Sequence, residues 1–486
     1  MSKHPSMPNL SSPSDRWESQ RRKSHEGLPT LTVTPLAAAA FAAALLQSAS
    51  CSSNRKDPRL DAAGKNPRLD AAGDVGSNPC GDPDPSFRDG DLDTLFAATS
   101  VPTFDFFLPQ ADWENLKAHA REEQFTSVQA CYQGRSLGTV GLRFKGSYGT
   151  LYECFDTQGN MICPRLSMKV KFDEYVEEQR FFGLKRLAFN AYRYDDSRMK
   201  EKLSYDLFRA AGIVAPRSAW ALLRVNGQSQ GLYGMVEPVD GRFAAHHFPQ
   251  SPDGNLYKEV WPTHASDQQL LTGLETNEEK ADVSGYGAFA LTFMAAADDA
   301  SRLAILSKHM DLDYLARFMA VEDAVISYDG VTYFFTDGTN INNHNYYIYE
   351  ESPTKFVLIP WDVESTFWID PEHAAPHWTV LPADCSLTYS YWGGKAIAPG
   401  CDGVFHALDT DLSRWRTAAH TLLDGPFSLT AMNALIERYL DVIGDAARSD
   451  PTPTMYSTFD AAVSYMESQI PTFRQRLETL IAPPAP

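Results

Sequence analysis

The most informative part of the sequence is Asn345-Tyr346-Tyr347-Ile348-Tyr349, followed by a turn at Glu351-Ser352-Pro353 and then by Phe356-Val357-Leu358-Ile359-Pro360-Trp361-Asp362. Two apolar runs around a proline-containing turn predict a β-hairpin. Asn345 opens this hairpin and Asp362 closes it. Because a hairpin brings its two ends together, we expect Asn345 and Asp362 to lie close to each other.

A third oxygen-bearing side chain precedes the hairpin. Asp329 directly follows a stretch of helical periodicity from Leu312 to Ile326. Phosphoryl transfer uses such a set: one carboxylate orients the acceptor hydroxyl, while an amide oxygen and a second carboxylate hold Mg²⁺ against the phosphates. Asp337 is a rival for the catalytic role, but the position just after the helix favours Asp329. The simpler alternative is that Asp329 caps a loop, Asn345 is an exposed strand residue and Asp362 begins a turn.

The first half of the chain shows mainly strand patterns. Strands are predicted at Val101 to Phe107, Thr139 to Phe144, Ser167 to Phe172, Trp220 to Val225 and Gly231 to Val236. The last two are joined by Asn226-Gly227, a strong signal for a tight hairpin turn. Helices are predicted over Gln110 to Glu123, and from the capping residues Asp195-Asp196-Ser197 to about Ala211, where Gly212 ends the helix.

The second half of the chain is richer in helix. Helical periodicity covers Leu312 to Ile326 and Leu412 to Ile481, with an interruption near Pro451 and Pro453. A strand-rich N-lobe followed by a helix-rich C-lobe predicts an α+β fold with a cleft between the lobes.

The charge balance excludes one class of partner. The chain of 486 residues has a formal net charge of -19, so it has no general electrostatic attraction to nucleic acid. Its hydrophobic content of 43% is ample for a packed core and argues against a mainly disordered chain. We therefore expect a folded protein without a nucleic-acid partner.

The beginning of the chain has the pattern of an export signal. Basic residues between Arg16 and Lys23 precede an apolar run from Leu36 to Leu46, and small residues then lead to Cys51. The run is shorter than the roughly 20 residues that a membrane-spanning helix needs. This order is typical of a lipoprotein signal peptide, so that residues 1–50 would be removed and Cys51 would carry a lipid anchor in the bacterial cell envelope. Ser48 stands where Leu is usual, and an ordinary secretory signal is the alternative.

The cysteines agree with export. Besides Cys51 there are six, an even number that allows three disulfides in an oxidising compartment. Cys154 and Cys163 are close enough in sequence to be a natural pair, and so are Cys385 and Cys401. Cys80 and Cys131 then remain, but the sequence alone leaves the connectivity open. No Cys/His spacing resembles a zinc site.

A tether is expected between the anchor and the folded part. Residues 56–64 and 65–73 are two copies of a short repeat, and the sequence that follows is rich in Pro, Asp and Gly. Such a composition is typical of flexible linkers. We therefore predict a tether over residues 51–95 and a folded domain over residues 96–486.

Two blocks of the sequence, His344-Asn345-Tyr346-Tyr347-Ile348-Tyr349 and Ile359-Pro360-Trp361-Asp362, resemble the signature blocks of the CotH (spore coat protein H) kinase family. The resemblance extends in order over about residues 100–480. The other similar blocks are Leu142-Arg143-Phe144-Lys145-Gly146-Ser147, Lys169-Val170-Lys171-Phe172-Asp173, Lys200-Glu201-Lys202-Leu203-Ser204-Tyr205, Ala215-Pro216-Arg217, Gly231-Leu232-Tyr233-Gly234-Met235-Val236-Glu237 and Gly254-Asn255-Leu256-Tyr257-Lys258.

The resemblance implies a two-lobed, atypical protein-kinase-like fold, with an N-lobe at about 96–240 and a C-lobe at about 241–486. It also implies roles for single residues. The nucleotide-binding residues would be Lys171, with Lys169 on the same face of its strand, Glu201 as the partner of the lysine, and Glu237 facing adenine between the lobes. Asp329 would be the catalytic carboxylate, and Asn345 and Asp362 the metal ligands.

The implied activity is transfer of the γ-phosphate of ATP, with Mg²⁺ or Mn²⁺, to hydroxyl side chains of exported or surface proteins. The alternative is a non-catalytic surface or assembly protein that keeps the kinase-like fold. Two departures from the family pattern bear on this choice. Glu364 stands where the family usually has Asp or Asn, and no Gly-x-Gly-x-x-Gly loop is present, with Gly146, Ser147 and Gly149 as the nearest substitute.

Overall fold

The computed structural model describes residues 79–146, 151–368, 375–391, 394–452 and 454–482. The predicted signal peptide, Cys51 and the repeats lie outside the described residues. The described end of the predicted tether is folded: Pro85–Phe87 form a 3₁₀ helix (η1) and Leu92–Leu95 form α3. Their side chains Phe87, Leu92 and Leu95 are buried in the core of the neighbouring barrel, so the folded domain begins before residue 96.

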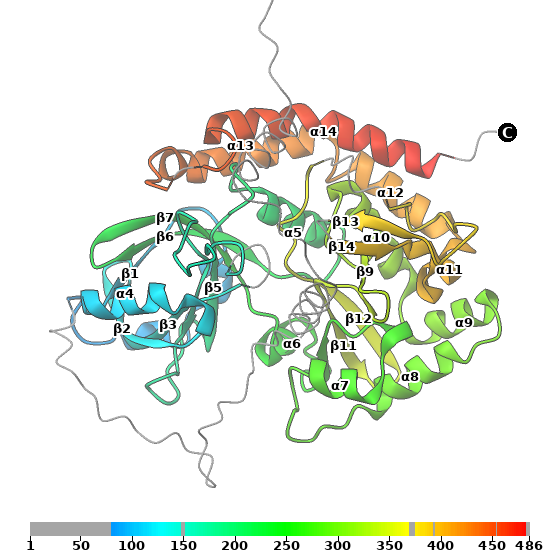
Figure 1. The fold of residues 1–486 in the computed structure, drawn as a ribbon, viewed down its shortest axis with the longest axis horizontal. Coiled ribbons are helices and arrows are strands. Elements are labelled where there is room, and N and C mark those ends of the chain that lie inside the picture. The colour runs from blue at the N-terminus through cyan, green and yellow to red at the C-terminus, as the bar shows by residue number, and fades with distance from the viewer. Residues whose placement is uncertain (1–78, 147–150, 369–374, 392–393, 453, 483–486) are drawn as a thin grey trace, which may run out of the picture. The chain divides into compact units, whose positions relative to one another are not determined.

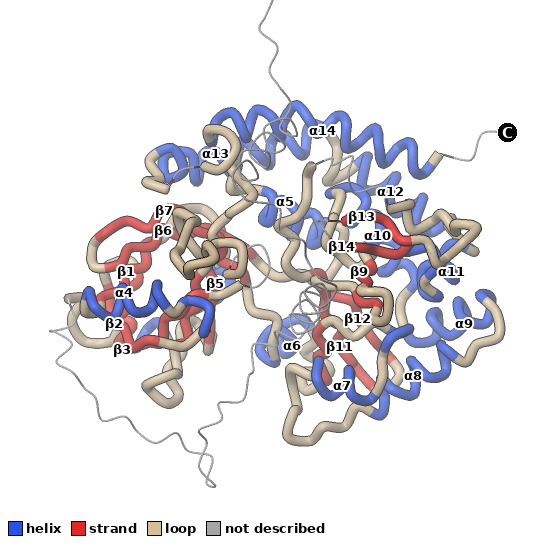
Figure 2. Tube along the Cα trace, viewed as in Figure 1, coloured by secondary structure: helices blue, strands red, loops and turns tan. Residues whose placement is uncertain are grey.

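A closed barrel occupies the first half of the domain (Figures 1 and 2). Its strands follow the order β1-β2-β3-β4-β5-β7-β6, and the parallel pairing of β1 with β6 closes it. The strands are β1 (Thr103–Phe107), β2 (Thr126–Tyr132), β3 (Arg135–Phe144), β4 (Met168–Lys171), β5 (Arg186–Asn190), β6 (Ser218–Val225) and β7 (Gln228–Val236). Alternation along β4 buries Met168 and Val170 in the barrel core and leaves Lys169 and Lys171 on the outer face.

The predicted hairpin between β6 and β7 is confirmed. Its turn residues Asn226 and Gly227 have φ angles of 49° and 76°. A two-residue turn of this kind needs positive φ at both positions, which Asn and Gly adopt readily. The register pairs Val225 with Gln228, directly beside the turn.

The rest of the domain, here called the helical region, consists of helices and two small sheets. The helices are α6 (Gly241–His247), α7 (Asp267–Gly273), α8 (Ser284–Met294), α9 (Asp299–His309), α10 (Leu312–Val325), α11 (Gly403–Asp409), α12 (Ser413–Asp424), α13 (Leu429–Arg448) and α14 (Phe459–Ile481), with the 3₁₀ helices η3 (Pro262–His264) and η4 (Pro399–Cys401). In the barrel half, α4 (Gln110–Ala118), η2 (Ala120–Glu122) and α5 (Lys200–Ala210) complete the list. The predicted α+β class is thereby confirmed.

The hairpin predicted from the most informative stretch is also confirmed. It consists of β11 (Tyr346–Ser352) and β12 (Lys355–Pro360), with Tyr346 opposite Pro360. β8 (Asn255–Lys258) adds a third strand on the other edge of β11. The second small sheet has the order β10-β9-β14-β13, with β9 (Phe334–Thr336), β10 (Ile341–Asn342), β13 (Thr388–Tyr391) and β14 (Gly394–Ile397).

Helix α5 connects the barrel to the helical region. Phe208 of α5 packs against Phe318 of α10, with ring centroids 5.1 Å apart. On another side, Asp206 accepts hydrogen bonds from Lys202 and from Tyr439 of α13. The start of α5 is held by Asp195, whose carboxylate accepts the backbone N–H of Lys200 at 2.8 Å. These contacts hold α5 between α10 and α13 and fix its first turn.

The helical hairpin α13–α14 reaches back to the barrel through its loop (Figure 1). Asp450 in this loop forms a buried ion pair with Arg165 at 2.8 Å and accepts the backbone N–H of Leu232 at 3.0 Å. The carboxylate of Asp196 accepts the backbone N–H groups of Met455, Tyr456 and Ser457. The loop that Pro451 and Pro453 predicted is therefore a contact segment between the helical region and the barrel.

Three disulfides join the six cysteines beyond Cys51. The pairs are Cys80–Cys131, Cys154–Cys163 and Cys385–Cys401. The last two are the pairs that spacing suggested, and the first joins the two cysteines whose pairing the sequence left open. Disulfides persist in oxidising compartments, which agrees with the expected export. None of the helices in the described part of the chain combines the length and the apolar character that crossing a membrane requires.

Candidate functional site

The two ends of the β11–β12 hairpin meet as predicted. The backbone N–H of Trp361 donates a hydrogen bond to the carbonyl of Asn345 at 2.9 Å. Asn345 and Asp362 both have left-handed backbone conformations, with φ angles of 65° and 50°. Non-glycine residues seldom adopt this conformation, and such residues are concentrated at functional sites. The backbone N–H of Asp362 is fixed by the hydroxyl of Tyr205 at 3.0 Å.

Asp329 lies beside Asn345. The amide Nδ2 of Asn345 donates to the carboxylate Oδ2 of Asp329 at 2.9 Å and to its backbone carbonyl at 2.8 Å. This leaves the amide oxygen Oδ1 as the atom of Asn345 that can ligate a cation. The rival residue Asp337 is exposed, and its carboxylate accepts the N–H groups of Thr339 and Asn340 in its own turn. The structure therefore brings Asp329, and not Asp337, to the hairpin.

Gly330, next to Asp329, lies close to a side chain of α10. A Cβ atom on Gly330 would lie 2.1 Å from the carboxylate Oε2 of Glu322, which belongs to the last turn of α10. Helix α10 ends at Val325, and the residue that follows it, Ile326, has a left-handed conformation with a φ of 53°. This residue turns the chain out of α10, three residues before Asp329.

A carboxylate that the sequence did not single out supports the start of the β11–β12 hairpin. Glu259 follows β8, and its Oε1 accepts the backbone N–H of Asn345 at 3.2 Å. Its Oε2 lies 3.6 Å from Nδ1 of His344, and its Oε1 lies 3.8 Å from Nζ of Lys258. These partners lower the pKa of Glu259 to about 2, although burial alone would raise it. The only signal in the sequence was its place after the similar block Gly254 to Lys258.

The acidic groups crowd one another. Burial raises the pKa of Asp329 to about 7, and Asp362 and Glu259 add to the rise, whereas His344 and the hydrogen bond from Asn345 oppose it. Burial and the charge of Asp362 also raise the pKa of Glu364 to about 7, against the effect of Lys145. The site therefore gathers oxygen ligands whose charges repel one another, a condition that a bound cation relieves.

Glu201 of α5 belongs to the same group of acids. Burial raises its pKa well above the usual range, and Glu364 and Asp362 contribute to the rise. Its Oε1 accepts a hydrogen bond from Nδ2 of Asn190 at 2.7 Å, and Asn190 in turn accepts one from Nζ of Lys145 at 2.8 Å. The lysine connected to Glu201 is thus Lys145, which follows β3, and the connection runs through an asparagine.

The structure does not bring Lys171 to Glu201. Nζ of Lys171 forms an ion pair with Glu174 at 2.7 Å, and 42% of the Lys171 side chain is exposed. Lys169 shares the outer face of β4 with Lys171, and it lies opposite Arg143 on β3 and Ala188 on β5. Burial lowers the pKa of Lys169 well below its usual value, and Arg186, Arg143 and Lys145 lower it further. These cations give the outer face of β3–β5 a positive charge.

Glu237 lies at the predicted place, directly after β7, but its carboxylate is occupied. It is fully buried, it accepts a hydrogen bond from Nε of Arg217 at 2.8 Å, and it lies 3.5 Å from Arg242. Two arginines therefore hold the Glu237 side chain. In this geometry its carboxylate is not directed at a site where it could make the predicted contact with adenine.

A cavity of about 210 Å³ lies where the barrel, α5 and the end of β12 meet. The residues that line it are Lys145, Ala188, Asn190, Glu201, Tyr205, Val236, Trp361 and Asp362. Glu201 and Asp362 were predicted as site residues. Lys145, Asn190 and Trp361 were not, although Lys145 and Trp361 belong to the similar blocks, because the sequence does not show which side chains the barrel turns toward the cavity.

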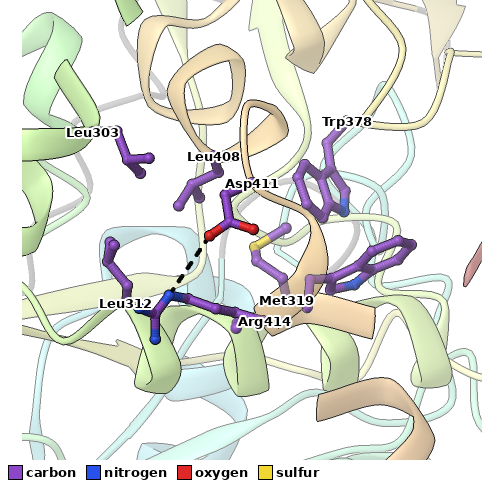
Figure 3. Close-up of a pocket in the computed structure, with 9 residues that line it drawn as sticks. Leu303, Leu312, Met319, Trp378, Leu408, Asp411 and Arg414 are labelled. Carbon is purple, nitrogen blue, oxygen red and sulfur yellow. Dashed lines mark ion pairs between the residues drawn. The ribbon is translucent and has the colours of Figure 1, made fainter. Parts of the chain in front are cut away.

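A second cavity, of about 340 Å³, lies elsewhere in the helical region. Figure 3 shows that its wall is largely apolar, with Leu303, Leu312 and Met319 around an ion pair between Asp411 and Arg414. Although it is larger, it contains none of the predicted site residues. Hydrogen-bonding chemistry is concentrated at the smaller cavity.

The oxygen donors at the two ends of the β11–β12 hairpin suit Mg²⁺. Within the described ranges, no group of three or more His, Cys, Asp or Glu side chains is arranged to hold a metal ion. Magnesium, however, usually takes one or two protein oxygens together with phosphate oxygens and water. Asn345 and Asp362 supply such oxygens beside the mutually repelling acids, so these residues fit the ion that the family resemblance implies.

Comparison with known proteins shows to which family the chain is related. The family model described as CotH kinase protein matches residues 142–479. Inner spore coat protein H of Bacillus subtilis (strain 168) is 28% identical over 207 residues, which are 40% of this chain and 54% of that protein. The chain thus spans about half the length of this relative. The matched range contains both the hairpin and the cavity described above, and the chain belongs to the CotH kinase protein family.

Proposed function

We propose that this chain is an atypical kinase that transfers the γ-phosphate of ATP, with Mg²⁺ or Mn²⁺, to hydroxyl side chains of other proteins. One observation carries the proposal: Asp329, Asn345 and Asp362 come together beside a cavity that also contains Glu201 and Lys145. Membership of the CotH kinase protein family supports it.

In this proposal the barrel is the N-lobe of a kinase-like fold and the helical region is its C-lobe. Helix α5 carries Glu201 inward from between them, and the nucleotide lies in the cleft where the two parts meet. The space that the cavity encloses is smaller than that of most small-molecule sites. Only part of ATP would therefore fit inside the cavity. Its phosphates would extend over the exposed Asp362.

The distribution of charge supports this placement. Lys145 lies on the barrel side together with Lys169 of β4, while Asp329, Asp362 and Glu364 lie on the side of the helical region. A polyphosphate bound between them would meet the lysines directly and the carboxylates through a divalent cation, held by Asn345 and Asp362. That ion would neutralise the charge on the phosphates.

Asp329 has the position of the catalytic base. Its pKa of about 7 lies near neutral pH, where a general base works best. The acceptor hydroxyl would give its proton to the Asp329 carboxylate while its oxygen forms a bond to the γ-phosphorus. The bond from that phosphorus to the β,γ-bridging oxygen breaks, and ADP leaves with the electron pair.

The acceptors we propose are exported or surface proteins. The disulfides agree with an oxidising compartment, the relative is named as a protein of the inner spore coat, and the beginning of the chain carries the export pattern. A lipid on Cys51 would hold the enzyme at the membrane of the cell envelope.

Transfer of labelled phosphate tests the proposal. Wild type, Asp362→Ala and Asp337→Ala are incubated with γ-labelled ATP, Mg²⁺ and a mixture of envelope proteins, and labelled protein is counted. We expect labelling by wild type and by Asp337→Ala, the matched control in an exposed turn, and loss of at least about 100-fold in Asp362→Ala. ATP binding without transfer by wild type would instead favour the non-catalytic alternative. Absence of ATP binding at millimolar ATP and Mg²⁺ would refute the kinase proposal.

A further inference from the structure

The lining of the smaller cavity combines two kinds of side chain. The polar ones are Lys145, Asn190, Glu201 and Asp362. The apolar part consists of Ala188, Val236 and Trp361. A ligand that fits this cavity therefore has a charged part and a flat or compact apolar part.

The apolar side chains come from two parts of the molecule. Ala188 and Val236 are direct cross-strand partners on β5 and β7, so their side chains lie next to each other on one face of the barrel wall. Trp361 comes from the helical region, at the end of β12. The cavity is thus bounded by two small side chains of the barrel and by an indole of the hairpin.

The indole of Trp361 is held firmly. Its backbone N–H is bound to the carbonyl of Asn345, and its ring meets the ring of Tyr347 edge-on, at 5.7 Å and an interplanar angle of 80°. The side chain is half-buried, so part of the ring remains accessible from the cavity. A fixed and partly accessible aromatic ring is a suitable surface for stacking.

We infer that the base of the nucleotide stacks on the indole of Trp361, with Ala188 and Val236 on the other side of the base. This inference rests on the proposed function and assigns a residue to nucleotide recognition that the sequence patterns did not. The phosphates then extend toward Lys145 and Asp362, which is adjacent to Trp361 in the chain. The Glu237 carboxylate takes no part, because Arg217 and Arg242 hold it.

Binding measurements on two ligands isolate the stacking contact. ATP has a base and inorganic tripolyphosphate has none, so calorimetric titration of both, with Mg²⁺, separates the base from the phosphates. The proteins are wild type, Trp361→Leu, Trp361→Phe and, as a control for loss of an exposed aromatic ring, Tyr465→Ala on α14, whose Tyr465 is 56% exposed. Leu keeps apolar bulk without an aromatic face, and Phe keeps the face.

The expected pattern is specific to stacking. Trp361→Leu lowers ATP affinity by about 10- to 100-fold and changes tripolyphosphate affinity less than about twofold, since base–aromatic stacking accounts for that range. Trp361→Phe stays within about fivefold of wild type, and Tyr465→Ala binds both ligands normally. Equal loss of both ligands in Trp361→Leu, or unchanged ATP affinity, overturns the inference and leaves the proposed function standing. Failure of wild type to bind either ligand overturns both.

Discussion

Lys145 and Lys171 differ in their surroundings although both lie on the outer face of the barrel wall. Lys145 is linked through Asn190 to the buried Glu201, and it lines the cavity. Lys171 is paired with Glu174 and is partly exposed. Phosphate binding in a kinase-like site needs a cation directed into the cavity, and Lys145 meets that need.

Alanine substitutions distinguish the two lysines. We expect Lys145→Ala to raise the KM for ATP about tenfold or more, because a charge-assisted contact to phosphate is lost. Lys171→Ala should stay within about twofold of wild type, because a surface ion pair contributes little. Steady-state kinetics with varied ATP checks both values. The opposite order of effects would restore the role that the family resemblance gave to Lys171.

Glu322 gives the protein a dependence of stability on pH. Burial raises its pKa to about 8, with Asp323 and Asp329 adding to the rise, whereas in the unfolded chain the ordinary value is 4.5. Between these values the folded state holds the extra proton, so the free energy of unfolding falls as pH rises from about 4.5 to about 8. The full change is on the order of 5 kcal/mol.

The variant Glu322→Gln removes this titration while keeping the size and neutral form of the side chain. Its melting temperature should match that of wild type near pH 5 and exceed it near pH 8.5, because only wild type must ionise a buried carboxyl. Thermal melts across that pH range provide the measurement. Parallel melting curves at all pH values would show that Glu322 titrates normally.

At the level of elements, a buried ion pair between Arg165 and Asp450 helps to hold the α13–α14 loop to the barrel. The side chains of Arg165 and Asp450 are 6% and 2% exposed. Removing one partner leaves an unpaired buried charge, and we expect Asp450→Ala to lower the free energy of unfolding by about 3–5 kcal/mol. Urea denaturation measures this loss. Asp445→Ala, at a fully exposed carboxylate on α13, is the control, with an expected change below about 0.5 kcal/mol.

Local signals in the sequence predicted several elements well. The β11–β12 hairpin, the β6–β7 turn and α10 each carry their own pattern of apolar periodicity or turn residues, and each is present. The strands β2 and β5 were missed. The closure of the barrel depends on pairing β1 with β6, which are far apart in the chain, and no local pattern encodes such pairing.

The residues of the candidate site also fall into two groups, those that local sequence signals place and those that long-range packing places. Asp329, Asn345 and Asp362 come together because the hairpin and the end of α10 are local features. Lys145, Asn190 and Trp361 line the cavity because separate strands converge there. Sequence spacing shows that Lys169 and Lys171 share a strand face, but it does not show which end of that face lies over the cavity. Long-range packing decides that point.

For the molecule as a whole, the disulfides differ in the length of chain that they enclose. Cys80–Cys131 spans 51 residues, whereas Cys154–Cys163 spans 9. Chain entropy predicts a loss of stability of about 4 kcal/mol on removing the first and about 2.5 kcal/mol on removing the second. Denaturation of the double variants Cys80→Ser/Cys131→Ser and Cys154→Ser/Cys163→Ser compares them. A larger effect of the short loop would mean that local packing, and not loop length, decides the contribution.

The central claim is that Asp329 serves as the catalytic base in phosphate transfer from ATP. The most direct test is Asp329→Asn, which keeps an oxygen to accept the hydrogen bond from Asn345 but cannot take up a proton. In single-turnover reactions with γ-labelled ATP and Mg²⁺, we predict ATP affinity near that of wild type and a transfer rate about 10²- to 10⁴-fold lower. Transfer by Asp329→Asn at the wild-type rate would contradict the account, and so would wild type that binds ATP but never releases ADP or labels a hydroxyl.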